Sequence, residues 1–360
     1  MPTFTRAGQL LAGSALLLAG LAQATPAIDW DAFNARTVSD HILPRYQQFA
    51  QHSQVLADTT VRWCESRSSS DFGAVQQAFD NSLQAWQGVQ HLQFGPVQLL
   101  MRNYGIQFWP DRKGITGRQL KEALQGPDSG SYDAEFFRHA SVSIKGYPAL
   151  ERLFYDEGAL HSLQNEANAC ALASAISTQL AHTAQAILDE WQAEPRTGQG
   201  SEDGEDTIAG LPELSLELLR SLVQPVEMIR DNKLERVLGK DMASARLQRA
   251  ENWRSGQSLQ SIVTNLAALQ ELYGAGEPSL DQILRQQGAA DQADQISGLF
   301  SQAQSQLEAL PENFAPALQD TDAYEQLKAL SRTLKALDIA LYDAMPAINA
   351  QLGFNSRDGD

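Results

Sequence analysis

Apolar residues recur at helical spacing along nearly the whole chain. In one stretch Phe72, Val75, Phe79, Leu83 and Trp86 follow one another at steps of three and four residues. This spacing places them on one face of an amphipathic helix. Alternating runs rich in Val, Ile and Thr, which would indicate strands, are scarce. We therefore predict an all-α protein with strand confined at most to short pieces.

The predicted helices form two groups, separated by a segment with the composition of a loop. Residues 194–212 read EPRTGQGSEDGEDTIAGLP and combine acids with Gly and Pro. We predict an N-terminal helical bundle over 25–195, an acidic linker over 196–211 and a C-terminal helical bundle over 212–360, with a cleft between the bundles. The candidate helices are 30–63, 71–95, 117–124, 165–193, 212–238, 241–273, 279–287, 291–309 and 321–348.

The N-terminus has the pattern of a cleavable signal peptide. Arg6 precedes an apolar stretch from Ala7 to Leu21, and the small-x-small sequence Ala22-Gln23-Ala24 follows. We predict a signal peptide over 1–24, cut after Ala24. The apolar stretch is short for a transmembrane helix, and no other stretch is long enough, so we expect no transmembrane segment in the mature protein.

The charge balance narrows the class of partner. The chain has 27 basic and 44 acidic residues, a formal net charge of −17. Such a chain repels phosphate backbones, which argues against nucleic acid as a partner. It suits a soluble protein or one that attracts cations.

Two cysteines, Cys64 and Cys170, are present. In an oxidising compartment an even pair favours one disulfide over two buried thiols.

The chain carries none of the standard catalytic signatures, such as GxSxG, a phosphate-binding glycine loop or HExxH. Two segments nevertheless place polar and aromatic groups where a plain bundle does not need them. Trp109 and Arg112 fall in the irregular stretch WPDRK, where they can form a binding wall or simply cover the end of a bundle. Arg254 and Ser255 fall in NWRSGQSL, beside a Gly that weakens a helix.

The segment KGYPALE holds the third group of candidates. Pro148 suits the first turn of a helix, and Glu151 follows three residues later, close to the helix N-terminus. A carboxylate there can cap its own helix, bind a cation or orient a guanidinium such as that of Arg254. Tyr147 supplies a hydroxyl that can donate or accept a hydrogen bond.

Several of these segments together resemble the imelysin family of bacterial envelope proteins. The resemblance rests on the helix of Trp86 running into FGP, on FWPDRK at 108–113, on KGYPALERLFY from Lys145, on NWRSGQSLQSIVTNL at 252–266 and on the terminal LGFNSRDGD. It implies two helical bundles with a site between them, a place in the periplasm, and relatives tied to iron uptake or described as metallopeptidases.

The family's hallmark GxHxxE is incomplete here. The aligned residues read GYPALE, so Gly146 and Glu151 match while Pro148 stands in place of the histidine. Proline offers no ligand atom, and catalytic zinc usually needs about three protein ligands. The His–Glu metal pair therefore cannot form from this segment, which argues against peptidase activity and leaves Glu151 as the one candidate metal ligand of the motif.

Three hypotheses follow for the function. The first is a non-catalytic periplasmic binding protein associated with iron or metal uptake, whose interbundle cleft is lined by Glu151, Tyr147, Arg112, Trp109, Arg254 and Ser255. Its ligand would be a small molecule, a divalent metal, iron or a peptide, and its partner an envelope component of iron uptake. The second is a metallopeptidase of the imelysin type. The third is a structural interaction module in which Glu151 and Arg254 form a buried pair between the bundles.

Overall fold

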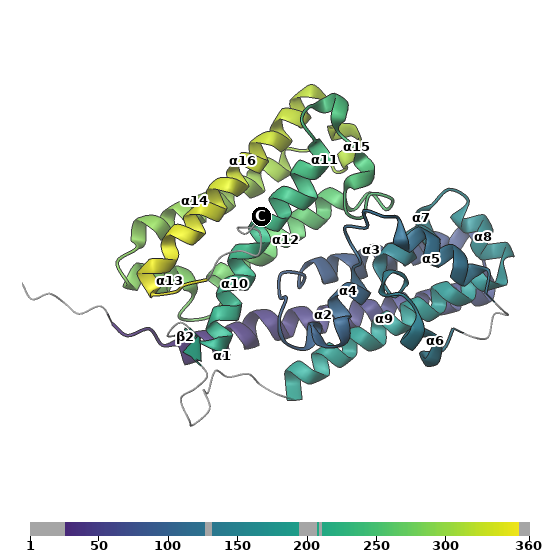
Figure 1. The fold of residues 1–360 in the computed structure, drawn as a ribbon, viewed down its shortest axis with the longest axis horizontal. Helices are drawn as coiled ribbons and strands as arrows, with labels where there is room; N and C mark the ends of the chain where they lie inside the picture. The colour runs from purple at the N-terminus through teal and green to yellow at the C-terminus, as the bar shows by residue number, and fades with distance from the viewer. Residues whose placement is uncertain (1–25, 127–131, 194–206, 209–210, 353–360) are drawn as a thin grey trace, which may run out of the picture.

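The computed structural model of the chain describes residues 26–126, 132–193, 207–208 and 211–352 (Figure 1). The predicted signal peptide over 1–24, most of the predicted linker over 196–211 and nearly all of the terminal LGFNSRDGD lie outside these ranges. Of the linker, Thr207–Ile208 (β1) pairs antiparallel with Leu211–Pro212 (β2). Apart from this short ladder the described chain is helical or irregular, which confirms the all-α prediction.

The first bundle, residues 30–193, is built on three long helices. Helix α2 (Leu43–Ser66) packs along α9 (Ala167–Ala193) and against α3 (Phe72–Gln87). A short helix, α1 (Trp30–Thr37), leads into α2 through a π-helical turn at Val38–Ile42. Shorter helices cover the rest of the bundle: α4 (Arg102–Ile106), α5 (Ile115–Leu124), α6 (Ala134–His139), α7 (Tyr147–Tyr155) and α8 (Ala159–Asn165).

The second bundle, residues 211–352, lies across the first (Figure 1, green to yellow). Helix α16 (Thr321–Ala344) packs against α14 (Ala290–Glu308) and α10 (Glu213–Met228). The other elements are the π-helical segment Ile229–Glu235, α11 (Arg236–Leu238), α12 (Ser258–Gly274), α13 (Leu280–Gln286) and α15 (Phe314–Ala317). Contacts between α1 and α10 and between α3 and α12 join the two bundles.

The helix predicted over 241–273 begins only at Ser258. Residues 241–257 form 3₁₀ turns and an irregular loop instead. Asn252 (φ 54°) and Gly256 (φ 75°) take left-handed backbone conformations that interrupt a helix. A Cβ on Gly256 would lie 2.8 Å from Oδ1 of Asn313, so a side chain there would also require the Asn313 side chain to move. Similarly, the helix predicted over 71–95 ends at Gln87.

Two further observations concern the cysteine pair and the length of the helices. Cys64 on α2 and Cys170 on α9 form a disulfide, as predicted. Every helix within the described ranges is too short or too polar to cross a membrane.

Candidate functional site

Helix α7 brings the incomplete motif to the boundary between the bundles. Its first turn follows Gly146, where an added Cβ would lie 2.2 Å from the carbonyl oxygen of Ile106. Only glycine allows this approach, which holds the start of α7 against the end of α4. Pro148 in the first turn lines a cavity, and Glu151 reaches the second bundle with only 5% of its surface exposed.

Glu151 binds the loop before α12 rather than capping its own helix. Its Oε1 accepts hydrogen bonds from the backbone N–H of Arg254 (3.1 Å), from the backbone N–H of Ser255 (3.0 Å) and from Oγ of Ser255 (2.8 Å). Burial raises the pKa of Glu151, although these hydrogen bonds oppose the rise. The carboxylate is therefore committed to a contact between the bundles.

The guanidinium of Arg254 pairs with a different carboxylate from the one predicted. Its Nε lies 2.5 Å from Oδ1 of Asp156, and its Cζ lies 4.3 Å from the centre of the Trp253 ring. Glu151 contacts the backbone of Arg254 instead. The predicted ion pair between the side chains of Glu151 and Arg254 does not form. Instead the backbone of Arg254 binds Glu151 and its guanidinium binds Asp156.

Tyr147 lies in the core of the first bundle. It is fully buried, and its hydroxyl is 2.6 Å from Oγ of Ser82. Burial raises its pKa above the ordinary value. The structure therefore places Tyr147 in the core beneath the site, where its contact with Ser82 holds α7 against α3.

A cavity of about 330 Å³ lies between the bundles, and we call it the arginine cavity. Among the predicted residues, Trp109, Glu151 and Arg254 line it. Arg236 and Arg249 line it as well and had no part in the sequence-based site. Positive side chains outnumber negative ones between residues 230 and 254 of this acidic chain. This local excess is the sequence feature that could have pointed to Arg236 and Arg249.

The positive charge in this cavity is only partly neutralised. Arg236 lies with its Cζ 5.9 Å from the centre of the Trp109 ring, and its buried Nη1 has no hydrogen-bond partner among the described residues. Burial and the neighbouring charges of Arg112 and Arg249 lower its pKa. No carboxylate in the described part of the chain forms an ion pair with any of these three guanidiniums.

The acids that line the arginine cavity are bound to backbone groups. Asp111 accepts hydrogen bonds from the backbone N–H of Ile115 and Thr116, both at 2.8 Å. Its pKa is lowered because these bonds stabilise the ionised form more than burial opposes it. Glu151 is held by the loop of Ser255. Neither acid reaches the guanidinium of Arg236, so the cavity suits an anionic group.

The residues of the motif do not fit a resident metal ion. Pro148 contributes no ligand atom, and Oε1 of Glu151 already accepts three hydrogen bonds. Over the described ranges, no three His, Cys, Asp or Glu side chains come together in an arrangement that could hold a metal. The motif therefore supplies no complete ligand set for a protein-bound metal.

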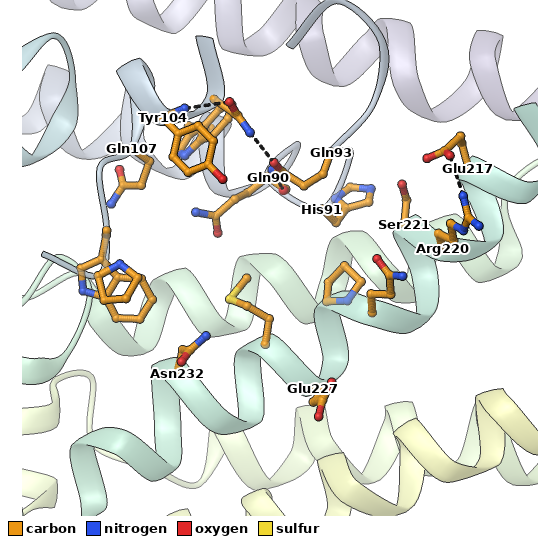
Figure 2. Close-up of a pocket in the computed structure, with 17 residues that line it drawn as sticks. Gln90, His91, Gln93, Tyr104, Gln107, Glu217, Arg220, Ser221, Glu227 and Asn232 are labelled. Carbon is orange, nitrogen blue, oxygen red and sulfur yellow. Dashed lines mark hydrogen bonds and ion pairs between the residues drawn. The ribbon is translucent and has the colours of Figure 1, made fainter. Parts of the chain in front are cut away.

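A second cavity, of about 390 Å³, shares Trp109 and Gln107 with the arginine cavity as lining residues. The first bundle contributes Gln90, His91 and Gln107, and the π-helical segment of the second contributes Asn232. Figure 2 shows these polar side chains gathered between the two bundles. We call this space the amide cavity.

Comparisons with known proteins place the chain among helical relatives. The family model Peptidase M75, imelysin, matches residues 42–341. An imelysin-like protein from Psychrobacter arcticum 273-4 has a similar structure (TM-score 0.73, 21% identity, 91% of this chain and 100% of that chain covered). So does a protein described as a putative iron-regulated protein A precursor from Parabacteroides distasonis ATCC 8503 (TM-score 0.69, 16% identity, 90% and 97% covered). No curated protein matches.

Proposed function

The chain belongs to the imelysin family, and from this premise we propose that it is a non-catalytic periplasmic binding protein of iron or metal uptake. The proposed ligand is an anionic chelate that carries the metal as cargo and binds in the arginine cavity. The sequence pattern of a signal peptide and the Cys64–Cys170 disulfide support a place outside the cytoplasm. The name of the Parabacteroides relative supports the connection with iron.

The observation that carries the proposal is the unpaired charge of Arg236. A buried N–H of a guanidinium without a partner is costly, and an anionic oxygen would satisfy it. Arg112 and Arg249 lie close enough to depress its pKa, so a single ligand with several carboxylates would relieve the repulsion among all three. Trp109 offers a flat apolar surface beside them.

The same geometry favours binding over peptide hydrolysis. A metallopeptidase needs a metal with an open coordination position and a base that can reach the attacking water. Here Pro148 replaces a ligand and Glu151 is tied to Ser255. A metal that arrives already chelated requires neither group, which reconciles a role in metal uptake with a motif that lacks its histidine.

The proposal is tested by titrating the purified mature protein calorimetrically with citrate and with ferric citrate. The arginine cavity predicts binding of both, weakened as ionic strength rises. Arg236→Ala should lower the affinity about tenfold or more, because a charge-assisted hydrogen bond is lost.

The matched control is Arg332→Ala, since Arg332 is an exposed arginine on α16. This variant should bind both ligands as the unmodified protein does. Failure of citrate and ferric citrate to bind, or equal binding by Arg236→Ala, would overturn the proposal. Cleavage of a protein substrate that depends on Glu151 would support the metallopeptidase hypothesis instead.

A further inference from the structure

The amide cavity has polar walls but no unpaired ionic side chain that faces it from the described residues. Of the charged residues that line it, Glu217 pairs with Arg220 at 3.0 Å and Glu227 pairs with Arg230 at 3.6 Å. The remaining polar lining consists mainly of side-chain amides and His91. A ligand for this space should therefore be uncharged and polar.

The tautomer of His91 follows from a chain of hydrogen bonds that begins at Arg45. Nε of Arg45 donates to Nδ1 of His41 at 3.2 Å, so Nδ1 of His41 is an acceptor and its proton lies on Nε2. That Nε2 lies 2.9 Å from Nε2 of His91 and donates to it. Burial lowers the pKa of both rings, to about 3 for His91, so both are neutral. His91 consequently carries its proton on Nδ1.

The orientation of the Gln107 amide follows from a second chain of hydrogen bonds. Ser261 Oγ donates to the carbonyl oxygen of Gln257 at 2.8 Å, so it accepts from Nδ2 of Asn252 at 3.1 Å. Oδ1 of Asn252 is then the acceptor for Nε2 of Gln107 at 3.3 Å. The carbonyl oxygen Oε1 of Gln107 is left as an acceptor.

Three residues that line the amide cavity each carry a buried polar group with no hydrogen-bond partner in the part of the chain that the structure describes. These groups are the N–H of Trp86 at Nε1, the N–H of His91 at Nδ1 and the carbonyl oxygen of Gln107. The set thus comprises two donors and one acceptor. Buried polar groups are normally paired, and a cluster of unpaired ones marks a place where another molecule supplies the partners.

The rim of the cavity adds an aromatic surface. Tyr104 lines it with 53% of its surface exposed, and Trp109 lines it from the wall shared with the arginine cavity. Just before Tyr104, Leu100 and Met101 take left-handed backbone conformations (φ 55° and 57°), which are costly for residues other than glycine. This strained turn leads directly into the α4 segment that presents Tyr104.

We propose that the amide cavity is a second binding site, for a neutral saccharide. Each sugar hydroxyl both donates and accepts, so adjacent hydroxyls can satisfy the N–H groups of Trp86 and His91 and the carbonyl of Gln107. The apolar face of the sugar ring would lie on Tyr104, and the amides of the wall would bind the remaining hydroxyls. The site requires no charge on its ligand, in contrast to the arginine cavity.

The test is calorimetric titration of the purified mature protein with glucose, N-acetylglucosamine and maltose. At least one of them should bind, with an affinity that does not depend on ionic strength. Trp86→Phe, which removes only the N–H and the smaller ring of the indole, and Tyr104→Ala, which removes an exposed ring, should each lower that affinity about tenfold. Circular dichroism should show that both variants stay folded.

Two control variants test whether the sugar binds in the amide cavity and nowhere else. Gln319→Leu changes an exposed amide that does not line the cavity and should bind sugar normally, as should Arg332→Ala, which changes an exposed arginine on α16. The proposal is overturned if none of the three sugars binds, if Trp86→Phe and Tyr104→Ala bind as well as the unmodified protein, or if Gln319→Leu and Arg332→Ala weaken binding as much as they do. Binding of an uncharged dipeptide amide in preference to all three sugars would likewise overturn it.

Discussion

Glu151 of the first bundle and Ser255 of the second are joined by two hydrogen bonds to a single oxygen, from the backbone N–H at 3.0 Å and from Oγ at 2.8 Å. The family motif is thereby turned into a contact between the bundles. The sequence suggests Glu151 as a metal ligand, but in the folded chain it accepts hydrogen bonds from the irregular loop that holds Ser255.

Replacing Glu151 should separate its role as an acceptor from its charge. Glu151→Ala leaves the N–H groups of Arg254 and Ser255 without their acceptor, and we expect a loss of about 2–3 kcal/mol in the free energy of unfolding. Glu151→Gln keeps a carbonyl oxygen at the same place and should lose about 1 kcal/mol or less. Urea denaturation of the three proteins measures both.

Equal losses in the two Glu151 variants would show that the charge matters more than the acceptor. The same variants also bear on the third hypothesis. If Glu151→Ala loses stability while citrate binding is unchanged, the residue is a structural contact between the bundles, as that hypothesis holds.

A buried ion pair within the second bundle contacts the first bundle at a second place. Nζ of Lys233 lies 2.6 Å from Oε2 of Glu251, and both side chains are 2% exposed. Nζ also donates to Oε1 of Gln87 and of Gln90, which belong to the first bundle. Lys233→Met should therefore cost about 3–5 kcal/mol, because it leaves Glu251 buried without its cation.

The double variant Lys233→Met with Glu251→Met should recover most of that loss, since apolar pairs can replace buried ion pairs. The partly exposed pair of Arg220 and Glu217 is the control, and Arg220→Met should change stability by about 1 kcal/mol or less. A double variant as unstable as Lys233→Met would contradict this account.

Asp338 should make the protein more stable in mild acid. Burial raises its pKa to about 6, despite the nearby guanidinium of Arg230, so the folded chain binds this proton more tightly than the unfolded chain does. Stability from this group therefore rises as the pH falls from 7 through 6 towards 4. Because the side chain is partly exposed, we expect a gain of roughly 1 kcal/mol, less than the full shift would give.

Asp338→Asn imitates the protonated form and tests this directly. Its stability relative to the unmodified protein should be greater at pH 7 than at pH 5, measured by urea denaturation at both values. Asp80, whose pKa burial also raises to about 6, should preserve part of the pH dependence. An identical difference at the two pH values would exclude Asp338 as the source.

The Cys64–Cys170 disulfide should contribute substantially to stability. It links α2 to α9 across 106 residues of sequence, and closing so long a loop restricts the unfolded chain. We expect Cys64→Ser with Cys170→Ser to lose about 2–5 kcal/mol. The midpoint of urea denaturation should fall to the same value when the unmodified protein is reduced, and an unchanged midpoint would contradict the prediction.

The sequence by itself determined the helical class, the long helices such as α9 and α16, the disulfide and the family. These features depend on periodic apolar residues, on an even pair of cysteines and on motifs that are contiguous in the chain. The start of α12 at Ser258 was not among them. Its local pattern is helical, and the left-handed residues Asn252 and Gly256 interrupt it where the loop passes close to Asn313.

Only the tertiary structure decided the composition of the site. It turned Glu151 towards Ser255, buried Tyr147 and brought Arg236 to Trp109, across 127 positions of sequence. It also left the polar groups of Trp86, His91 and Gln107 without partners among the described residues, around one cavity. Helical periodicity reports which face of a helix is buried, but the partner of a polar group is set by segments that meet only when the bundles pack together.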